Sequence, residues 1–140
     1  MKKYILLLLV SLACPNLFAQ SFQIGHATIT LTDTSQNNRS IPTEIYYPAD
    51  VSGNNVPVTI ANNDKFPLIS FGHGFVMVWD AYENIWEALV PNGYIVAFPK
   101  TEGSLAPSHL EFGKDIAFVI SELTAFGQDT SSFLFNRVDT

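Results

Sequence analysis

Five consecutive residues, Phe71-Gly72-His73-Gly74-Phe75, have the types and spacing for chemistry on a carbonyl group. They close an apolar run, residues 66–71, of the kind that forms a buried strand in a parallel sheet. Two glycines around a histidine permit a sharp turn at the carboxyl end of that strand, where open α/β sheets bind ligands. Backbone N–H groups held at such a turn can stabilise the negative charge that acyl transfer builds on a carbonyl oxygen.

The side chains around this turn each have a catalytic and a structural interpretation. His73 has the chemistry of a base, but its position between glycines favours bonding to backbone groups that hold the turn. Trp79 is a candidate for substrate contact, and the alternative for it, as for Trp86, is a place in the core or on a helix face. His109 is expected at the surface, and Asp115 either on a helix surface or as a turn anchor.

No group in the chain completes a catalytic or metal site. The sequence contains no Gly-x-Ser-x-Gly, and Gly103-Ser104 lies in a predicted loop without the second glycine. The three histidines, His26, His73 and His109, lack the spacing of metal ligands. We therefore expect no metal, no cofactor and no catalytic residue within this chain.

The elements upstream of the turn predict a β-hairpin. Residues 22–32 combine apolar positions with β-branched threonines. After a polar turn, residues 41–47 form the second strand, which Pro48 is expected to end. Residues 50–65 are rich in Gly, Pro and Asn and predict a surface loop with a short extended piece at residues 56–60.

Downstream of the turn, helix and strand alternate. Asp80 is expected to cap a helix, with Glu83 closing a capping box, and residues 91–93 end it. Residues 94–98 predict a second buried strand, and Ser108 begins a long amphipathic helix. This order predicts an α/β fold with a parallel sheet and right-handed crossovers. The polar, irregular end predicts no strand for the last helix to cross over to, so the fold is expected to be incomplete.

These motifs resemble the α/β-hydrolase superfamily, and within it the secreted polyester hydrolase (PET hydrolase-like), cutinase-like and chlorophyllase-like group, near the dienelactone hydrolases. The matching stretches are Phe71-Gly72-His73-Gly74-Phe75, Leu89-Val90-Pro91-Asn92-Gly93-Tyr94-Ile95-Val96, Tyr46-Tyr47-Pro48, Phe112-Gly113-Lys114-Asp115 and Val138-Asp139-Thr140. The resemblance covers nearly all of residues 22–140. It implies the N-terminal part of an α/β-hydrolase fold and a serine ester hydrolase that works through an acyl-enzyme.

The resemblance also implies roles for particular residues. The backbone N–H of Phe75 would contribute to the oxyanion hole, and its ring, with Trp79, would contact a hydrophobic or aromatic ester. The oxyanion loop would comprise Gly72, His73 and Gly74. The nucleophile elbow, the acid and the catalytic histidine would follow Thr140, so residues 21–140 are expected to be the N-terminal portion of one domain, truncated before the elbow.

Two other interpretations stay open. The chain could belong to a non-catalytic secreted binding protein that keeps the α/β-hydrolase scaffold without its triad. It could also be a self-contained small secreted domain, for which residues 21–140 would unfold in one cooperative transition.

Residues 1–20 are expected to be a secretory signal peptide. A basic start and an apolar run over residues 4–13 precede a small residue that allows cleavage near Ala19 or Gln20. The run is shorter than the roughly 20 apolar residues that a membrane span needs. We therefore expect a secreted or periplasmic protein without a membrane span, with lipid attachment at Cys14 as the less favoured alternative.

The charge balance argues against polyanionic partners. The chain has 7 basic and 13 acidic residues, and the only charged residues among residues 1–20 are Lys2 and Lys3. The remaining 5 basic and 13 acidic side chains carry a formal charge of −8. Such a surplus disfavours nucleic acid and anionic membrane surfaces.

Overall fold

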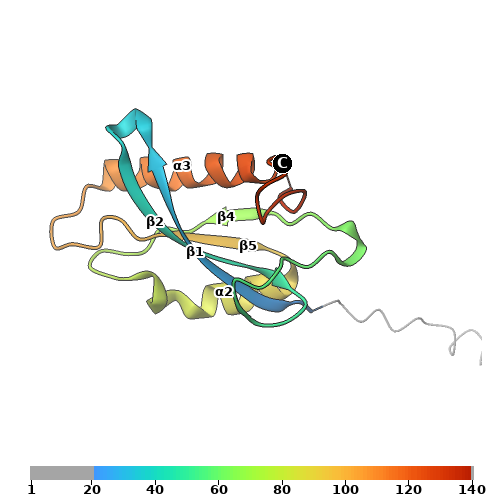
Figure 1. Cartoon of the computed structure of the whole chain (residues 1–140). Helices are drawn as coiled ribbons and strands as arrows, with labels where there is room; N and C mark the ends of the chain where they lie inside the picture. The colour runs from blue at the N-terminus through green and yellow to red at the C-terminus, as the bar shows by residue number, and fades with distance from the viewer. Residues whose placement is uncertain (1–20, 140) are drawn as a thin grey trace, which may run out of the picture.

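The computed structural model describes residues 21–139, so the expected signal peptide and Cys14 lie outside the described residues. A mixed sheet and two helices make up the fold, with α2 (Glu83–Leu89) and α3 (His109–Phe126) on opposite faces of the sheet (Figure 1). The strand order is β3 (Gly53–Asn54), β1 (Gln23–Asp33), β2 (Arg39–Ala49), β5 (Ile95–Pro99) and β4 (Leu68–Ser70). In the described part of the chain, neither helix has the length and apolar character needed to cross a membrane.

The expected hairpin is confirmed. β1 and β2 pair antiparallel along their whole length, from Gln23 opposite Ala49 to Asp33 opposite Arg39. The prediction that Pro48 ends the second strand is wrong. The carbonyl of Pro48 accepts from the N–H of Thr59 at 2.9 Å, on the side of β2 that faces away from β1, so the missing N–H of this proline interrupts no bond to β1.

The two parallel strands lie in the predicted order but differ in burial. β5 is buried over its whole length, because β2 and β4 flank it and a helix covers each face. β4 pairs parallel to β5, with Leu68 opposite Ile95 and Ser70 opposite Ala97. β4 is only partly buried, contrary to the prediction for residues 66–71, because it lies at the edge of the sheet.

The helix that follows β4 begins differently from the prediction. The capping box of Asp80 and Glu83 is absent, because Trp79–Tyr82 forms a 3-10 turn and α2 begins after it without a side-chain cap. The predicted end is confirmed, and Gly93 adopts a left-handed φ of 87° that favours glycine.

The long helix begins as predicted at Ser108. Its hydroxyl oxygen accepts from the N–H of Glu111 at 3.2 Å. The reciprocal bond of a capping box is absent, because the N–H of Ser108 donates to the carboxylate of Glu102 instead, at 2.5 Å. On the inner face of α3, Val119 and Leu123 are fully buried against the sheet.

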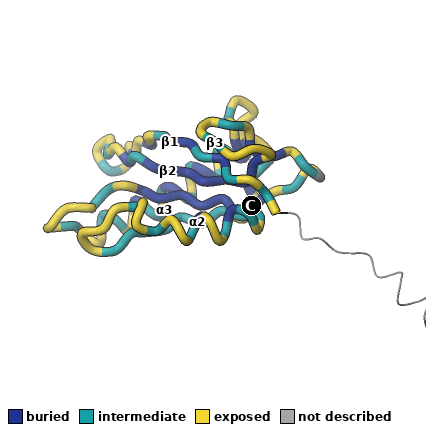
Figure 2. The backbone as a smooth tube through the Cα atoms, turned by 90° about the horizontal axis from the view of Figure 1, so that it is seen from below, coloured by how far each residue is buried: buried dark blue, intermediate teal, exposed yellow. Residues whose placement is uncertain are grey.

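The core has two parts, one on each face of the sheet. Figure 2 shows that the strands between the two faces are the most buried part of the chain. Successive residues of β2 point to opposite faces, so Tyr47 belongs to the cluster beneath α3 and Tyr46 to the cluster beneath α2. The segment 127–139 was predicted to be polar and irregular, but it also contributes apolar side chains to the core. Leu134 and Val138 are buried in the first cluster, and Val138 forms a parallel bridge with Phe66, just before β4.

Candidate functional site

The turn after β4 passes close to the side chains of α3 at Gly72. The N–H of Phe71 still donates to the carbonyl of Ala97 at 2.8 Å, and the chain leaves the sheet at Gly72. A Cβ at Gly72 would lie 2.7 Å from Cδ1 of Ile116 on α3, closer than side-chain carbons approach one another. The first glycine of the motif therefore allows the turn to pass directly over α3.

His73 ties this turn to the end of the neighbouring strand. Its Nδ1 lies 3.0 Å from the carbonyl oxygen of Gly74, and its Nε2 lies 2.8 Å from the carbonyl oxygen of Thr101. The ring also packs against Phe112 on α3, with 4.5 Å between ring centroids. These contacts are those of a side chain that holds backbone groups in place.

A second side chain fixes the turn from the helix side. The N–H of Gly74 donates to the phenolic oxygen of Tyr82 at 2.7 Å. This role of Tyr82 was not predicted from the sequence, and its position in the 3-10 turn makes it possible. Within residues 21–139 the N–H of Phe75 donates to no acceptor, whereas the N–H of the preceding residue, Gly74, donates to Tyr82.

The residues that follow the turn expose four apolar side chains in succession. Phe75 is 63% exposed, and residues 76–78 are exposed as well. Val76 has a φ of 55°, a left-handed conformation that is strained for a β-branched residue. Exposed apolar runs and strained backbone both cost stability, and both are found where a loop contacts a ligand. Residues 75–78 therefore form the apolar loop of the candidate site.

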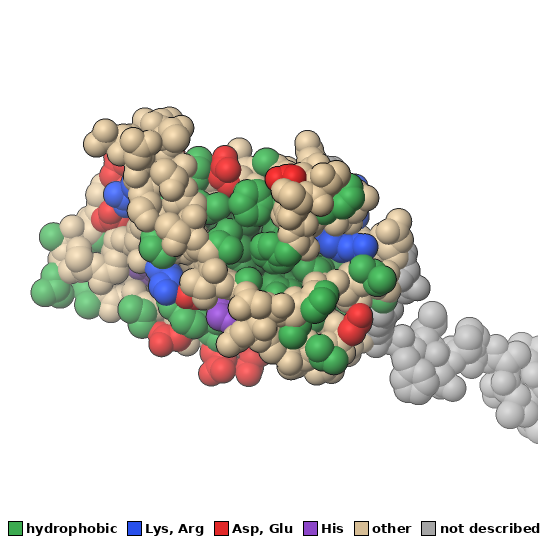
Figure 3. All heavy atoms as spheres, viewed as in Figure 1, with side chains coloured by type: hydrophobic (Ala, Val, Ile, Leu, Met, Phe, Trp, Pro, Cys, Tyr) green, Lys and Arg blue, Asp and Glu red, His purple; other side chains and the backbone are tan. Residues whose placement is uncertain are grey.

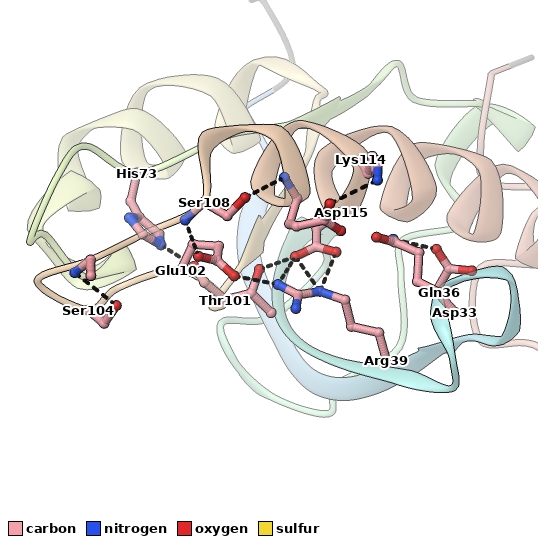
Figure 4. A network of polar contacts seen from close by, with 12 residues as sticks. Asp33, Gln36, Arg39, His73, Thr101, Glu102, Ser104, Ser108, Lys114 and Asp115 are labelled. Atoms are coloured by element: carbon pink, nitrogen blue, oxygen red, sulfur yellow. Dashed lines mark hydrogen bonds and ion pairs between the residues drawn. The ribbon is translucent and has the colours of Figure 1, made fainter.

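A buried ion-pair network holds the loop to which His73 is bonded (Figure 4). Asp115 is fully buried and accepts from Arg39 through both carboxylate oxygens, at 2.8 to 3.1 Å, and from the hydroxyl of Thr101 at 2.6 Å. Arg39 also donates to Glu102 at 2.7 Å, and Glu102 accepts from the N–H of Ser108. Of the two alternatives for Asp115, the turn anchor is confirmed and the helix surface is wrong.

The electrostatics of this network agree with its geometry. Hydrogen bonds to Asp115 and then to Glu102 raise the pKa of the Arg39 guanidinium. The backbone N–H of Ser108 lowers the pKa of Glu102, and Arg39 lowers it further. Arg39 and Glu102 are thus charged at neutral pH, and the network fixes Thr101, whose carbonyl lies against His73.

A second charged cluster lies beneath the apolar loop and was missed from the sequence. Glu44 is buried on β2 and accepts from Lys100 at 2.7 Å and from Thr28 at 2.6 Å, with Nε2 of His26 at 2.8 Å. Burial alone raises the pKa of Glu44, but the hydrogen bonds from these three neighbours outweigh it, so its pKa lies below the usual value. The available signal was an acidic residue among the mostly apolar residues of the predicted strand 41–47.

The two tryptophans differ in burial: Trp86 is a buried member of the cluster beneath α2, and Trp79 is partly buried against the same cluster. Trp79 lines a cavity of about 120 Å³ beneath the loop together with His73 and Lys100, and the Lys100 ammonium lies 5.8 Å from its ring centroid. Trp86 is buried and stacks on Tyr46, with ring centroids 4.2 Å apart and planes within 2°.

The predicted residues Gly72, His73, Gly74 and Phe75 lie in the turn and loop that follow β4. The fifth predicted site residue, Trp79, begins the 3-10 turn that comes after this loop. His109 is exposed, as expected, at the start of α3. In residues 21–139 no hydroxyl is hydrogen-bonded to a histidine, and no three His, Cys, Asp or Glu side chains are grouped as metal ligands would be. Among the described residues the loop therefore presents the unpaired backbone N–H of Phe75, with no hydroxyl–histidine pair beside it.

Comparison with known proteins gives the fold but no family. No family model matches the chain, and no curated protein matches it in sequence. Among solved structures it is similar to the ferulic acid esterase from Streptomyces cinnamoneus, with a TM-score of 0.53 and 17% sequence identity. The match covers 91% of this chain and 51% of the esterase, so the chain spans about half the length of that protein. The described residues therefore have a partial α/β fold that is also found in an esterase.

Proposed function

We propose that this chain supplies the oxyanion-binding part of a secreted serine carboxylester hydrolase. The observation that carries the proposal is the exposed apolar loop, residues 75–78, which follows the Gly-His-Gly turn at the carboxyl end of a parallel strand. In sheets of this kind that end is where ligands bind. The strained φ of Val76 is consistent with a loop held for binding.

In this proposal the N–H of Phe75 donates to the carbonyl oxygen of the ester as negative charge develops on it. His73 and Tyr82 hold the preceding turn, so the donor is in place before the reaction begins. A serine in a Gly-x-Ser-x-Gly elbow, contributed by residues after Thr140, attacks the carbonyl carbon and forms the acyl-enzyme. Water then hydrolyses the acyl-enzyme and releases the acid.

The loop composition favours a hydrophobic or aromatic ester as the substrate. Residues 75–78 expose only apolar side chains, and the ring of Trp79 lies directly beneath them. An apolar acyl or aromatic group can bury surface there, whereas a charged substrate would lose hydration without a matching partner. Activity on a polyester of the kind that the resemblance suggests is the finer form of this proposal, and export through residues 1–20 is part of it.

The test uses the protein expressed from the complete reading frame. We expect it to hydrolyse a short p-nitrophenyl ester and to be labelled covalently by a fluorophosphonate. We also expect any variant that loses the labelling to lose the hydrolytic activity with it. Comparing that ester with an aromatic polyester film then distinguishes a small-ester enzyme from a polymer-active one. Absence of both labelling and hydrolysis would overturn the proposal and favour a non-catalytic binding protein with the same fold.

A further inference from the structure

An apolar groove of about 540 Å³ opens on the face of the sheet that carries α3. Figure 3 shows it as a hollow lined by hydrophobic side chains, with basic side chains at one end. Its walls come from the strands β1 and β2, the loop 55–60, and the segment 133–137, which is far from the others in the sequence. Its principal lining residues are Ile29, Tyr47, Val58, Ile60, Phe133 and Phe135.

This groove is separate from the candidate esterase site. The segment 133–137 leads into the bridge between Val138 and Phe66, which lies before β4, whereas the oxyanion loop follows the other end of β4. Tyr47 lines the groove, and its neighbour Tyr46 faces the opposite side of the sheet. No residue lines both the groove and the cavities beneath the loop.

The groove leaves several large apolar side chains exposed to solvent. Ile60 is 70% exposed, and the rings of Phe133 and Phe135 are exposed by about two-fifths. The volume lies within the range of roughly 300–1,000 Å³ that is typical of small-molecule sites. The hydroxyl of Tyr47 is already used, because it donates to the carbonyl of Val56 at 2.8 Å. Apart from Asn55 and Arg137, the interior therefore offers mainly apolar contact.

One positive charge lines this mostly apolar groove. Arg137 lines the groove and makes one long hydrogen bond, 3.3 Å from its guanidinium to the carbonyl oxygen of Asp64. Among the described residues no carboxylate lies within salt-bridge distance of it, although acidic side chains outnumber basic ones 13 to 5 over residues 21–140. A guanidinium whose N–H donors are free can bind both oxygens of a carboxylate.

We propose that this groove binds an aliphatic carboxylate, with the chain lying among the apolar walls and the carboxylate on Arg137. The apolar walls account for the chain, and the one guanidinium accounts for the head group. A second copy of this chain is the competing occupant. The acidic surplus disfavours it, because two copies of charge −8 repel each other on approach. The proposal is independent of the esterase activity.

Calorimetric titration of the full chain with decanoate and with 1-decanol, both below their aggregation concentrations, tests the proposal. We expect decanoate to bind at least tenfold more tightly than the alcohol, because only the carboxylate engages Arg137. Shortening the acid by one methylene is expected to weaken binding about fourfold. Equal binding of acid and alcohol, or no dependence on chain length, would overturn the proposal.

Two matched variants locate the site. Ile60→Glu places a negative charge in the groove at an exposed position, and we expect it to weaken decanoate binding at least tenfold. Leu110→Glu makes the same change at an equally exposed position, 70%, outside the groove, and we expect it to leave binding unchanged. Loss of binding in both variants, or in neither, would refute the assignment. So would a concentration-dependent dimer that Ile60→Glu dissociates and that does not bind decanoate.

Discussion

Replacing Arg39 by methionine tests whether the buried network holds the loop that anchors His73. Arg39→Met leaves the carboxylate of Asp115 fully buried with the hydroxyl of Thr101 as its remaining side-chain donor. Breaking one partner out of a buried ion pair costs about 3–5 kcal/mol. Because the Arg39 side chain is 27% exposed, solvent weakens the pair, and we expect the lower end, about 3 kcal/mol.

The assay is urea denaturation followed by circular dichroism. With a denaturant slope of about 2 kcal/mol per molar, the loss corresponds to a midpoint lower by about 1.5 M. The control is Lys114→Met, which removes an exposed pair with Glu111, at 49% and 34% side-chain exposure, and should cost less than about 0.5 kcal/mol.

Hydrogen exchange gives a second, local measurement of the same change. In Arg39→Met we expect faster amide exchange over residues 101–108, because Arg39 holds both Thr101, through Asp115, and Glu102. Equal midpoint shifts in Arg39→Met and Lys114→Met, with unchanged exchange in this loop, would refute the reasoning.

Three further predictions concern pH, backbone strain and the chain as given. The folded-state pKa of Glu44 is depressed, so its contribution to stability is present above the ordinary value of 4.5 and is lost as the pH falls below it; thermal melts should show this acid loss, and Glu44→Gln should reduce its slope. Val76→Gly should stabilise the protein by about 0.5–1 kcal/mol, while the same change at the extended Val78 should destabilise it; a loss in both would show that the φ of 55° is not held in solution. Residues 21–140 alone should not hydrolyse p-nitrophenyl esters, because oxyanion stabilisation without a nucleophile leaves only a small enhancement; turnover blocked by a serine-directed phosphonate would show that a nucleophile was missed.

The sequence predicted the elements that depend on local signals. The hairpin, the strand at residues 94–98 and the helix starting at Ser108 follow from periodicity and capping, and all three are present. The box at Asp80 failed because a 3-10 turn replaces the expected first helical turn. Pro48 stays within β2 because the position of its missing N–H faces away from β1. Neither the 3-10 turn at Trp79 nor this orientation of Pro48 can be predicted from the neighbouring residues in the sequence.

The site was predictable where it depended on the backbone and unpredictable where it depended on distant side chains. The two glycines within residues 72–74 are by themselves enough to predict a sharp turn. The contact between Arg39 and Asp115 joins residues 76 positions apart. The hydrogen bond from the N–H of Gly74 to Tyr82 depends on the path that the chain takes into α2. Only the folded chain brings these groups together.

The most direct test of the proposed oxyanion role compares Phe75→Pro with Phe75→Ala in the protein from the complete reading frame. Proline removes the backbone N–H at this position, whereas alanine keeps it and removes the exposed ring. If this N–H stabilises the oxyanion, kcat on a p-nitrophenyl ester falls about 10²–10³-fold in Phe75→Pro. In Phe75→Ala the change should be confined mainly to KM. Equal kcat values for the two variants would contradict an oxyanion role for this loop.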